Sequence, residues 1–127
     1  MTPRRYVLIV EDDNWLAESY SLILTQAGWT AHTVHSAKKA LEAIDEKMPD
    51  VVLLDILLPG ANAVELMHEL QSYSDTRKLP IVLCTTLNHQ HLNRESLEQY
   101  GVKAVLNKAR LTPQHLLNAL LQAIKNE

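Results

Sequence analysis

Short apolar runs alternate with helix-like stretches from one end of this 127-residue chain to the other. The runs are rich in Val, Ile and Leu and show no polar alternation, which is typical of strands that a parallel sheet buries on both faces. They lie at residues 6–10, 51–54, 81–84 and 104–106, and a more polar run at 30–34 suits an edge strand. The alternation predicts a doubly wound, open α/β fold with five parallel strands, helices on both faces of the sheet and right-handed crossovers.

Side chains typical of helix ends mark where the intervening helices begin and stop. Ser36, Asn62 and Thr112 can cap the N-terminus of a helix, and Gly28 and Gly101 can end one. The apolar residues between these positions recur at helical spacing. The five expected helices cover residues 16–27, 36–44, 62–70, 91–100 and 112–124.

Composition and charge narrow the class of protein. Hydrophobic residues make up 46% and charged residues 21%, so we expect residues 1–127 to form one globular domain, either a stand-alone protein or a piece cut from a longer one. The net charge of −3 and the lack of a Lys/Arg run argue against direct nucleic-acid binding. No apolar run approaches the roughly 20 residues that cross a bilayer. The N-terminus does not read as a signal peptide, and the lone Cys84 suits a reducing compartment, so we expect a cytoplasmic location and no membrane partner.

Side chains able to bind metal ions and phosphate follow four of the predicted strands. Glu11 and Asp12 follow the first strand, Asp55 the third, Thr85 the fourth and Lys108 the fifth. The carboxyl ends of parallel strands meet at one edge of an open sheet, where ligands of such folds bind. Grouped carboxylates repel one another until a cation neutralises them, and Mg²⁺ commonly binds through one or two carboxylates while it keeps waters and phosphate oxygens.

This set of side chains suits phosphoryl transfer. A carboxylate such as Asp55 can act as the nucleophile and become an acyl phosphate. In such reactions a protein mainly positions groups and neutralises charge, so Lys108 would pair with one phosphoryl oxygen and Thr85 would donate a hydrogen bond to another. The sequence therefore predicts an Mg²⁺-dependent phosphorylation site at Asp55.

Four motifs in chain order, VLIVEDD, VVLLDILLPG, PIVLCTT and VLNKA, place these residues in a known pattern. Over essentially its whole length the chain resembles the receiver domain of two-component response regulators. The resemblance implies a flavodoxin-like sheet with the strand order 2-1-3-4-5. It also implies an Mg²⁺ site formed by Glu11, Asp12, Asp55 and the backbone carbonyl of Leu57.

The same resemblance implies roles and partners. Asp55 would be the phosphorylated residue, Thr85 the switch hydroxyl and Lys108 the phosphate-binding amine. A histidine kinase or a phosphotransfer protein would supply the phosphoryl group. The face formed by the fourth helix, fifth strand and fifth helix would contact a downstream protein or a fused effector domain, and a homodimer is a further option. Such a protein is a signalling phosphoacceptor that assists its own phosphorylation and dephosphorylation rather than an enzyme.

Three positions depart from the family's pattern. Ala109 follows Lys108 where the family usually has proline, often after a cis peptide bond, so we expect either a trans bond with a shifted loop or a strained cis bond. Val105 stands on the fifth strand where the family often has Tyr or Phe, so the usual aromatic relay is missing. Thr86 is larger than the small residue usual there and could narrow access to Asp55.

Three functions other than that of a phosphoacceptor can be weighed against the sequence. A receiver-like scaffold that binds partners without being phosphorylated is the alternative, and Ala109 and Val105 favour it a little. An aspartyl-phosphate phosphatase would carry its nucleophile after the first strand and a second Asp two positions later, whereas the acid directly after the first strand here is Glu11. The three glycines of the chain are too few and too scattered for a nucleotide-binding glycine loop.

Three further residues near the predicted site are not assigned a part in phosphoryl transfer. Asp13 is expected to be a solvated helix start, and Cys84 is expected to be a small core residue. Trp15, in the first turn of the first helix, is expected either to contact a partner or to pack against the domain.

Overall fold

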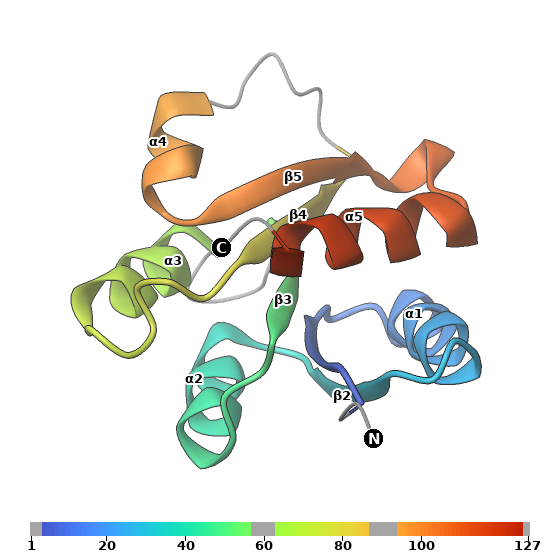
Figure 1. The fold of residues 1–127 in the computed structure, drawn as a ribbon, viewed down its shortest axis with the longest axis horizontal. Coiled ribbons are helices and arrows are strands. Elements are labelled where there is room, and N and C mark those ends of the chain that lie inside the picture. The colour runs from blue at the N-terminus through green and yellow to red at the C-terminus, as the bar shows by residue number, and fades with distance from the viewer. Residues whose placement is uncertain (1–3, 57–62, 87–93, 126–127) are drawn as a thin grey trace.

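The computed structural model describes residues 4–56, 63–86 and 94–125, which form five strands and five α-helices (Figure 1). The strands are β1 (Tyr6–Val10), β2 (Thr30–Val34), β3 (Val51–Asp55), β4 (Ile81–Thr85) and β5 (Val102–Asn107). They form one parallel sheet in the order β2-β1-β3-β4-β5. The predicted fold class and strand order are confirmed, and the polar run at 30–34 is an edge strand, as expected.

The helices are α1 (Asn14–Gln26), α2 (Ala37–Glu46), α3 (Ala63–Ser72), α4 (Arg94–Gln99) and α5 (Pro113–Lys125), and a short 3-10 helix, η2 (Lys108–Arg110), precedes α5. Two predicted caps are confirmed. The hydroxyl oxygen of Ser36 accepts a hydrogen bond from the backbone N–H of Lys39, and that of Thr112 accepts one from His115, each with an N···O distance of 3.2 Å. Asn62 and the expected helix start at 91 lie outside the described residues. None of the described helices is long and apolar enough to cross a membrane.

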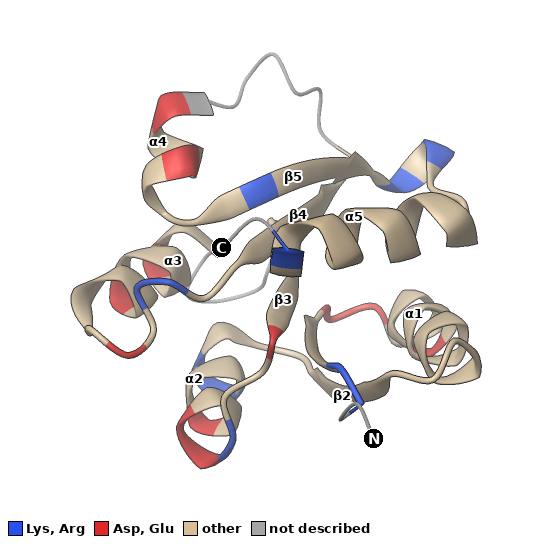
Figure 2. Cartoon of the chain, viewed as in Figure 1, with Lys and Arg blue, Asp and Glu red and all other residues tan. Residues whose placement is uncertain are grey.

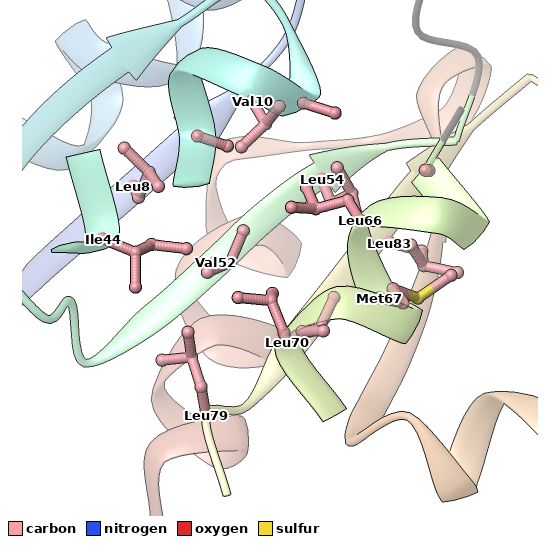
Figure 3. Close-up of a cluster of buried hydrophobic side chains, with 14 of the residues drawn as sticks. Leu8, Val10, Ile44, Val52, Leu54, Leu66, Met67, Leu70, Leu79 and Leu83 are labelled. Atoms are coloured by element: carbon pink, nitrogen blue, oxygen red, sulfur yellow. The ribbon is translucent and has the colours of Figure 1, made fainter. Parts of the chain in front are cut away.

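Two layers of helices cover the sheet, with α1 and α5 on one face and α2 and α3 on the other (Figure 1). Successive residues of a strand point to opposite faces, so Val7 and Ile9 join one buried cluster while Leu8 and Val10 join the other. Figure 3 shows the α2/α3 side, where Leu66 and its neighbours fill the space between helix and sheet. This packing fixes the strands, and with them the carboxyl edge on which the candidate site is built.

Two described glycines lie just past helix ends with positive φ, and one of them is crowded. Gly101, after α4, has a φ of 86°, and a Cβ added there would lie 3.1 Å from the carbonyl oxygen of Leu79. Gly28, after α1, has a φ of 91° and nothing within 4 Å of an added Cβ. We expect Gly28→Ala to lower the free energy of unfolding by about 1 kcal/mol, the cost of a left-handed backbone, and Gly101→Ala by about 2 kcal/mol. Urea denaturation of both variants measures the difference, and equal losses would contradict the crowding at Gly101.

Candidate functional site

Three carboxylates meet at the carboxyl edge of the sheet. Glu11 and Asp12 follow β1, and Asp55 is the last residue of the adjacent strand β3. One carboxylate oxygen from each of the three lies within 4.8 Å of the other two. Glu11 and Asp55 are buried, at 2% and 5% exposure, whereas Asp12 is open to solvent. The structure thus brings together the three acids that the strand-end pattern named, and acidic residues colour the segment between β1 and α1 in Figure 2.

An ammonium group lies against both buried acids. The Nζ atom of Lys108 is 2.7 Å from Oε1 of Glu11 and 3.2 Å from Oδ2 of Asp55. Lys108 opens η2 directly after β5, and its neighbour Ala109 donates its backbone N–H to Oδ1 of Asn107 at 2.9 Å. The described residues contain no cis peptide bond, so the trans alternative is the one found at Lys108–Ala109. The side chain of Asn107 and the 3-10 turn direct this segment without a proline.

Burial and charge act in opposite directions on these groups. Burial raises the pKa of Glu11 and the Asp55 carboxylate adds to the rise, while the Lys108 ammonium and the backbone N–H of Asp13 reduce it without cancelling it. Burial on its own would lower the pKa of Lys108, but the Glu11 and Asp55 carboxylates outweigh this effect and the pKa is raised. Lys108 is therefore held in its charged form. Among the described residues, the site sets three carboxylates against this one ammonium, so it is short of positive charge.

The donor atoms fit a hard divalent cation. Oε1 of Glu11 is buried and accepts no hydrogen bond of regular geometry from the residues that the structure describes, although the Lys108 ammonium lies beside it. Oε2 of Glu11 accepts the N–H of Asp13 at 3.2 Å. A buried carboxylate oxygen with spare acceptor capacity favours a cation, and the exposed Asp12 adds an oxygen where waters can complete a coordination shell. The pocket of Glu11, Asp12 and Asp55 could therefore hold a metal ion, while Leu57 lies outside the described residues.

The residues predicted to relay a signal lie on the two strands beyond β3. Thr85 is the last residue of β4, one position beyond the Asp55–Cys84 pair of the β3–β4 ladder, and it is fully buried. Thr86 is exposed. Val105 on β5 is half-buried and packs against the buried cluster on the α2/α3 face of the sheet. The hydroxyl of Thr85 therefore belongs to the same sheet edge as Asp55. On β5, the aliphatic side chain of Val105 stands where the family often has Tyr or Phe.

One residue at this edge was missed by the sequence analysis. His35 follows β2, and its ring Nδ1 lies 2.8 Å from the backbone carbonyl oxygen of Glu11. The strand-end rule would have named it, because β2 is parallel to the other strands and ends at the same edge.

The structure also tests the roles expected of Asp13, Cys84 and Trp15. Asp13 is the N-cap of α1, since its Oδ1 accepts the N–H of Trp15 at 2.9 Å and that of Leu16 at 3.3 Å, so the expected helix start is confirmed. Cys84 is a buried core residue, as expected, and its Sγ lies 3.3 Å from the hydroxyl of Tyr20. Trp15 is 83% exposed, so the packing alternative for it is wrong.

Comparison with known proteins gives a consistent family. The family model of the response regulator receiver domain matches residues 7–121. Among curated proteins, the chain is similar to the DNA-binding response regulator MtrA of Mycolicibacterium smegmatis, with 37% identity over 84 residues that cover 66% of this chain and 36% of MtrA. The chain spans about a third of the length of the first curated relatives it matches.

Solved structures share the fold. A sensor protein from Polaromonas sp. JS666 is 31% identical with a TM-score of 0.87, and the match covers 98% of both chains. The receiver domain of a sensor histidine kinase from Pseudomonas aeruginosa, solved with a magnesium ion in its active-site cleft, is 23% identical with a TM-score of 0.84 over 97% of this chain and 99% of that one, a likeness of fold alone. Because the family model covers most of the chain and the acidic pocket lies at the expected sheet edge, this chain belongs to the response regulator receiver domain family.

Proposed function

We propose that this receiver domain accepts a phosphoryl group on Asp55, with Mg²⁺ bound by Glu11, Asp12 and Asp55, and that phosphorylation changes its binding to partners. The observation that carries the proposal is the meeting of these three carboxylates within 4.8 Å, with the Lys108 ammonium 2.7 and 3.2 Å from two of them. A carboxylate that becomes an acyl phosphate needs positive charge close by, because the incoming group is itself anionic. This pocket offers one fixed cation and the ligands for a second.

The chemistry would be a direct displacement. A carboxylate oxygen of Asp55 attacks the phosphorus of the donor, and a new P–O bond forms while the bond from phosphorus to the leaving group breaks and the leaving group keeps the electron pair. The Lys108 ammonium, already beside Oδ2 of Asp55, would pair with an oxygen of the arriving group. The hydroxyl of Thr85 would donate a hydrogen bond to another oxygen. When bound, Mg²⁺ would supply further neutralisation of phosphoryl charge.

The partners follow from the family. The donor would be a histidine kinase or a phosphotransfer protein, and the output surface would be the face of α4, β5 and α5, with Val105 in place of an aromatic relay. MtrA is DNA-binding by name, and this chain matches about a third of it. We propose that this chain does not itself bind nucleic acid, because its net charge is −3. In the family's manner, the domain would assist both formation and hydrolysis of its own acyl phosphate.

The proposal is tested by incubating the protein with acetyl phosphate and following its intact mass. We expect the gain of one phosphoryl group in the presence of Mg²⁺, no gain with a chelator, and complete loss of the gain in Asp55→Asn. Asp45→Asn, which alters an exposed acid of α2, is the matched control and should be phosphorylated like the wild type. No mass gain in the wild type, or a gain that survives Asp55→Asn, would favour the alternative of a scaffold that is not phosphorylated.

A further inference from the structure

We infer that His35 is a positioning residue of the acidic pocket: its ring holds the peptide group from which both Glu11 and Asp12 extend, and so preorganises the site for a divalent cation. This inference rests on the proposed function, since it concerns the proposed Mg²⁺ site. Its starting observation is the 2.8 Å contact between Nδ1 of His35 and the carbonyl oxygen of Glu11. A carbonyl oxygen only accepts hydrogen bonds, so Nδ1 is the donor, and it can donate whether the ring is neutral or charged.

The backbone delivers this ring to a fixed place. Val10 and Val34 are the last pair of the β1–β2 ladder, and the N–H of Glu11 donates to the carbonyl of Val34 at 3.1 Å. Ser36, on the other side of His35, is the N-cap of α2 and is held by its own hydrogen bond to that helix. His35 is therefore set between the end of a strand and the start of a helix. The hydrogen bond from its side chain to Glu11 links the segments that follow β1 and β2, one residue beyond the last pair of the ladder.

The contact matters because of which carbonyl it reaches. The carbonyl of Glu11 belongs to the planar peptide group that joins Glu11 to Asp12, and this plane contains the Cα atoms of both residues. A hydrogen bond that fixes the plane therefore restricts the directions in which both carboxylates leave the backbone. The side chain of Glu11 is also held by Lys108 and by the N–H of Asp13. Asp12 is exposed, so its carboxylate gains most from a fixed backbone.

Fixing the peptide group between Glu11 and Asp12 should raise the affinity of the pocket for Mg²⁺. Bringing exposed Asp12 into a coordination shell costs conformational entropy, and a preorganised peptide group reduces that cost. Substituting a group that orients a metal ligand typically costs about 10- to 100-fold in metal affinity. His35 is itself exposed, and water can partly replace its hydrogen bond, so we expect a smaller effect of about three- to tenfold.

The test is a titration of the full chain with Mg²⁺, in which the amide signals of residues 11–13 are followed by ¹H–¹⁵N NMR. We expect His35→Ala to raise the Kd for Mg²⁺ about three- to tenfold. His35→Asn keeps an N–H donor near the position of Nδ1 and should stay within about twofold of the wild type. His32→Ala removes an exposed histidine that lies on β2 itself and should leave the Kd unchanged. Circular dichroism checks that each variant is folded.

The outcomes separate the inference from the function on which it rests. Equal Kd values for the wild type and His35→Ala would overturn the inference and leave the metal site intact. A Kd for His35→Asn as high as that for His35→Ala would overturn the hydrogen bond as the cause. If the wild type showed no saturable shift with Mg²⁺, the proposed metal site would fail, and the inference with it.

Discussion

Replacing Lys108 with methionine is expected to lower the free energy of unfolding by about 3 kcal/mol in Mg²⁺-free buffer at neutral pH. The Lys108 ammonium contacts Glu11 and Asp55 at 2.7 and 3.2 Å, and both acids are buried. Without the ammonium, two carboxylates lie together with no cation from the described part of the chain between them. Removing one partner of a buried ion pair costs more than the pair contributes, because the remaining charge is left uncompensated. Methionine keeps the length and apolar stem of lysine, so the loss of packing is small.

Mg²⁺ should reverse part of this loss. The ammonium and the metal compete for the same carboxylates, so we expect Lys108→Met to bind Mg²⁺ more tightly than the wild type and to gain more stability from it. Urea denaturation with Mg²⁺ and with chelator measures both effects. Lys39→Met is the matched control, because the Lys39–Glu42 pair is exposed, and its loss should change stability by less than about 0.5 kcal/mol. A Lys108→Met variant as stable as the wild type in chelator would contradict the neutralising role of Lys108.

Replacing Glu11 with glutamine is expected to raise the free energy of unfolding of the metal-free protein at pH 7. Burial, together with the Asp55 carboxylate, raises the pKa of Glu11 above its ordinary value of 4.5. A raised carboxyl pKa means that the folded protein holds the proton more tightly than the unfolded chain. The stability contributed by this group is therefore complete below the ordinary pKa and is lost as the pH rises through the raised pKa. Glutamine cannot ionise, so Glu11→Gln does not lose this stability as the pH rises.

The stabilisation of Glu11→Gln should disappear when Mg²⁺ is present. The wild type gains binding energy from the metal, whereas Glu11→Gln should bind Mg²⁺ about tenfold more weakly or worse, because a charged ligand is gone. Unfolding measured from pH 4 to 8 in chelator should show a difference between the two proteins that grows with pH. Glu69→Gln, at an exposed position of α3, should stay within about 0.5 kcal/mol of the wild type. A Glu11→Gln variant less stable than the wild type at pH 7 in chelator would contradict a raised pKa of Glu11 in the folded protein.

Much of the fold follows from local pattern in the chain. The runs that became β1, β3 and β4 contain little but Val, Ile and Leu, and both faces of these strands are buried. Ser36 and Thr112 could be read as caps because a helix needs an acceptor for its first N–H groups at that position. The strand order came from the family resemblance, since periodicity does not say which strands are neighbours.

The meeting of the acids was predictable, whereas the details of the site were not. The carboxyl ends of parallel strands lie at one edge of the sheet, and the strand order implied by the resemblance puts the first and third strands side by side, so Glu11, Asp12 and Asp55 are expected to lie close together. The peptide bond before Ala109 could be trans or cis on sequence grounds, and the hydrogen bond from Ala109 to Asn107 shows how a trans loop still places Lys108. Long-range contacts of this kind depend on geometry that no local spacing encodes.

His35 and Trp15 mark the limits of the sequence analysis more plainly. The contact of His35 is with the backbone carbonyl of Glu11, just past the end of β1. Every residue type has such a carbonyl, so the strand-end rule can place His35 at this edge but cannot predict the contact. Trp15 could pack or remain exposed on sequence grounds, because a helix start near a sheet edge allows both. The structure leaves it exposed beside the N-cap Asp13.

Asp55 is the residue proposed to carry the phosphoryl group, and chemical trapping identifies the modified position directly. Borohydride reduces an aspartyl acyl phosphate to homoserine, so treatment of the phosphorylated protein followed by peptide mapping marks the modified position. We expect homoserine at position 55 alone, formed only after incubation with acetyl phosphate and Mg²⁺. Homoserine at Asp12 or at any other acid, or none in a protein that has gained the mass of a phosphoryl group, would contradict it.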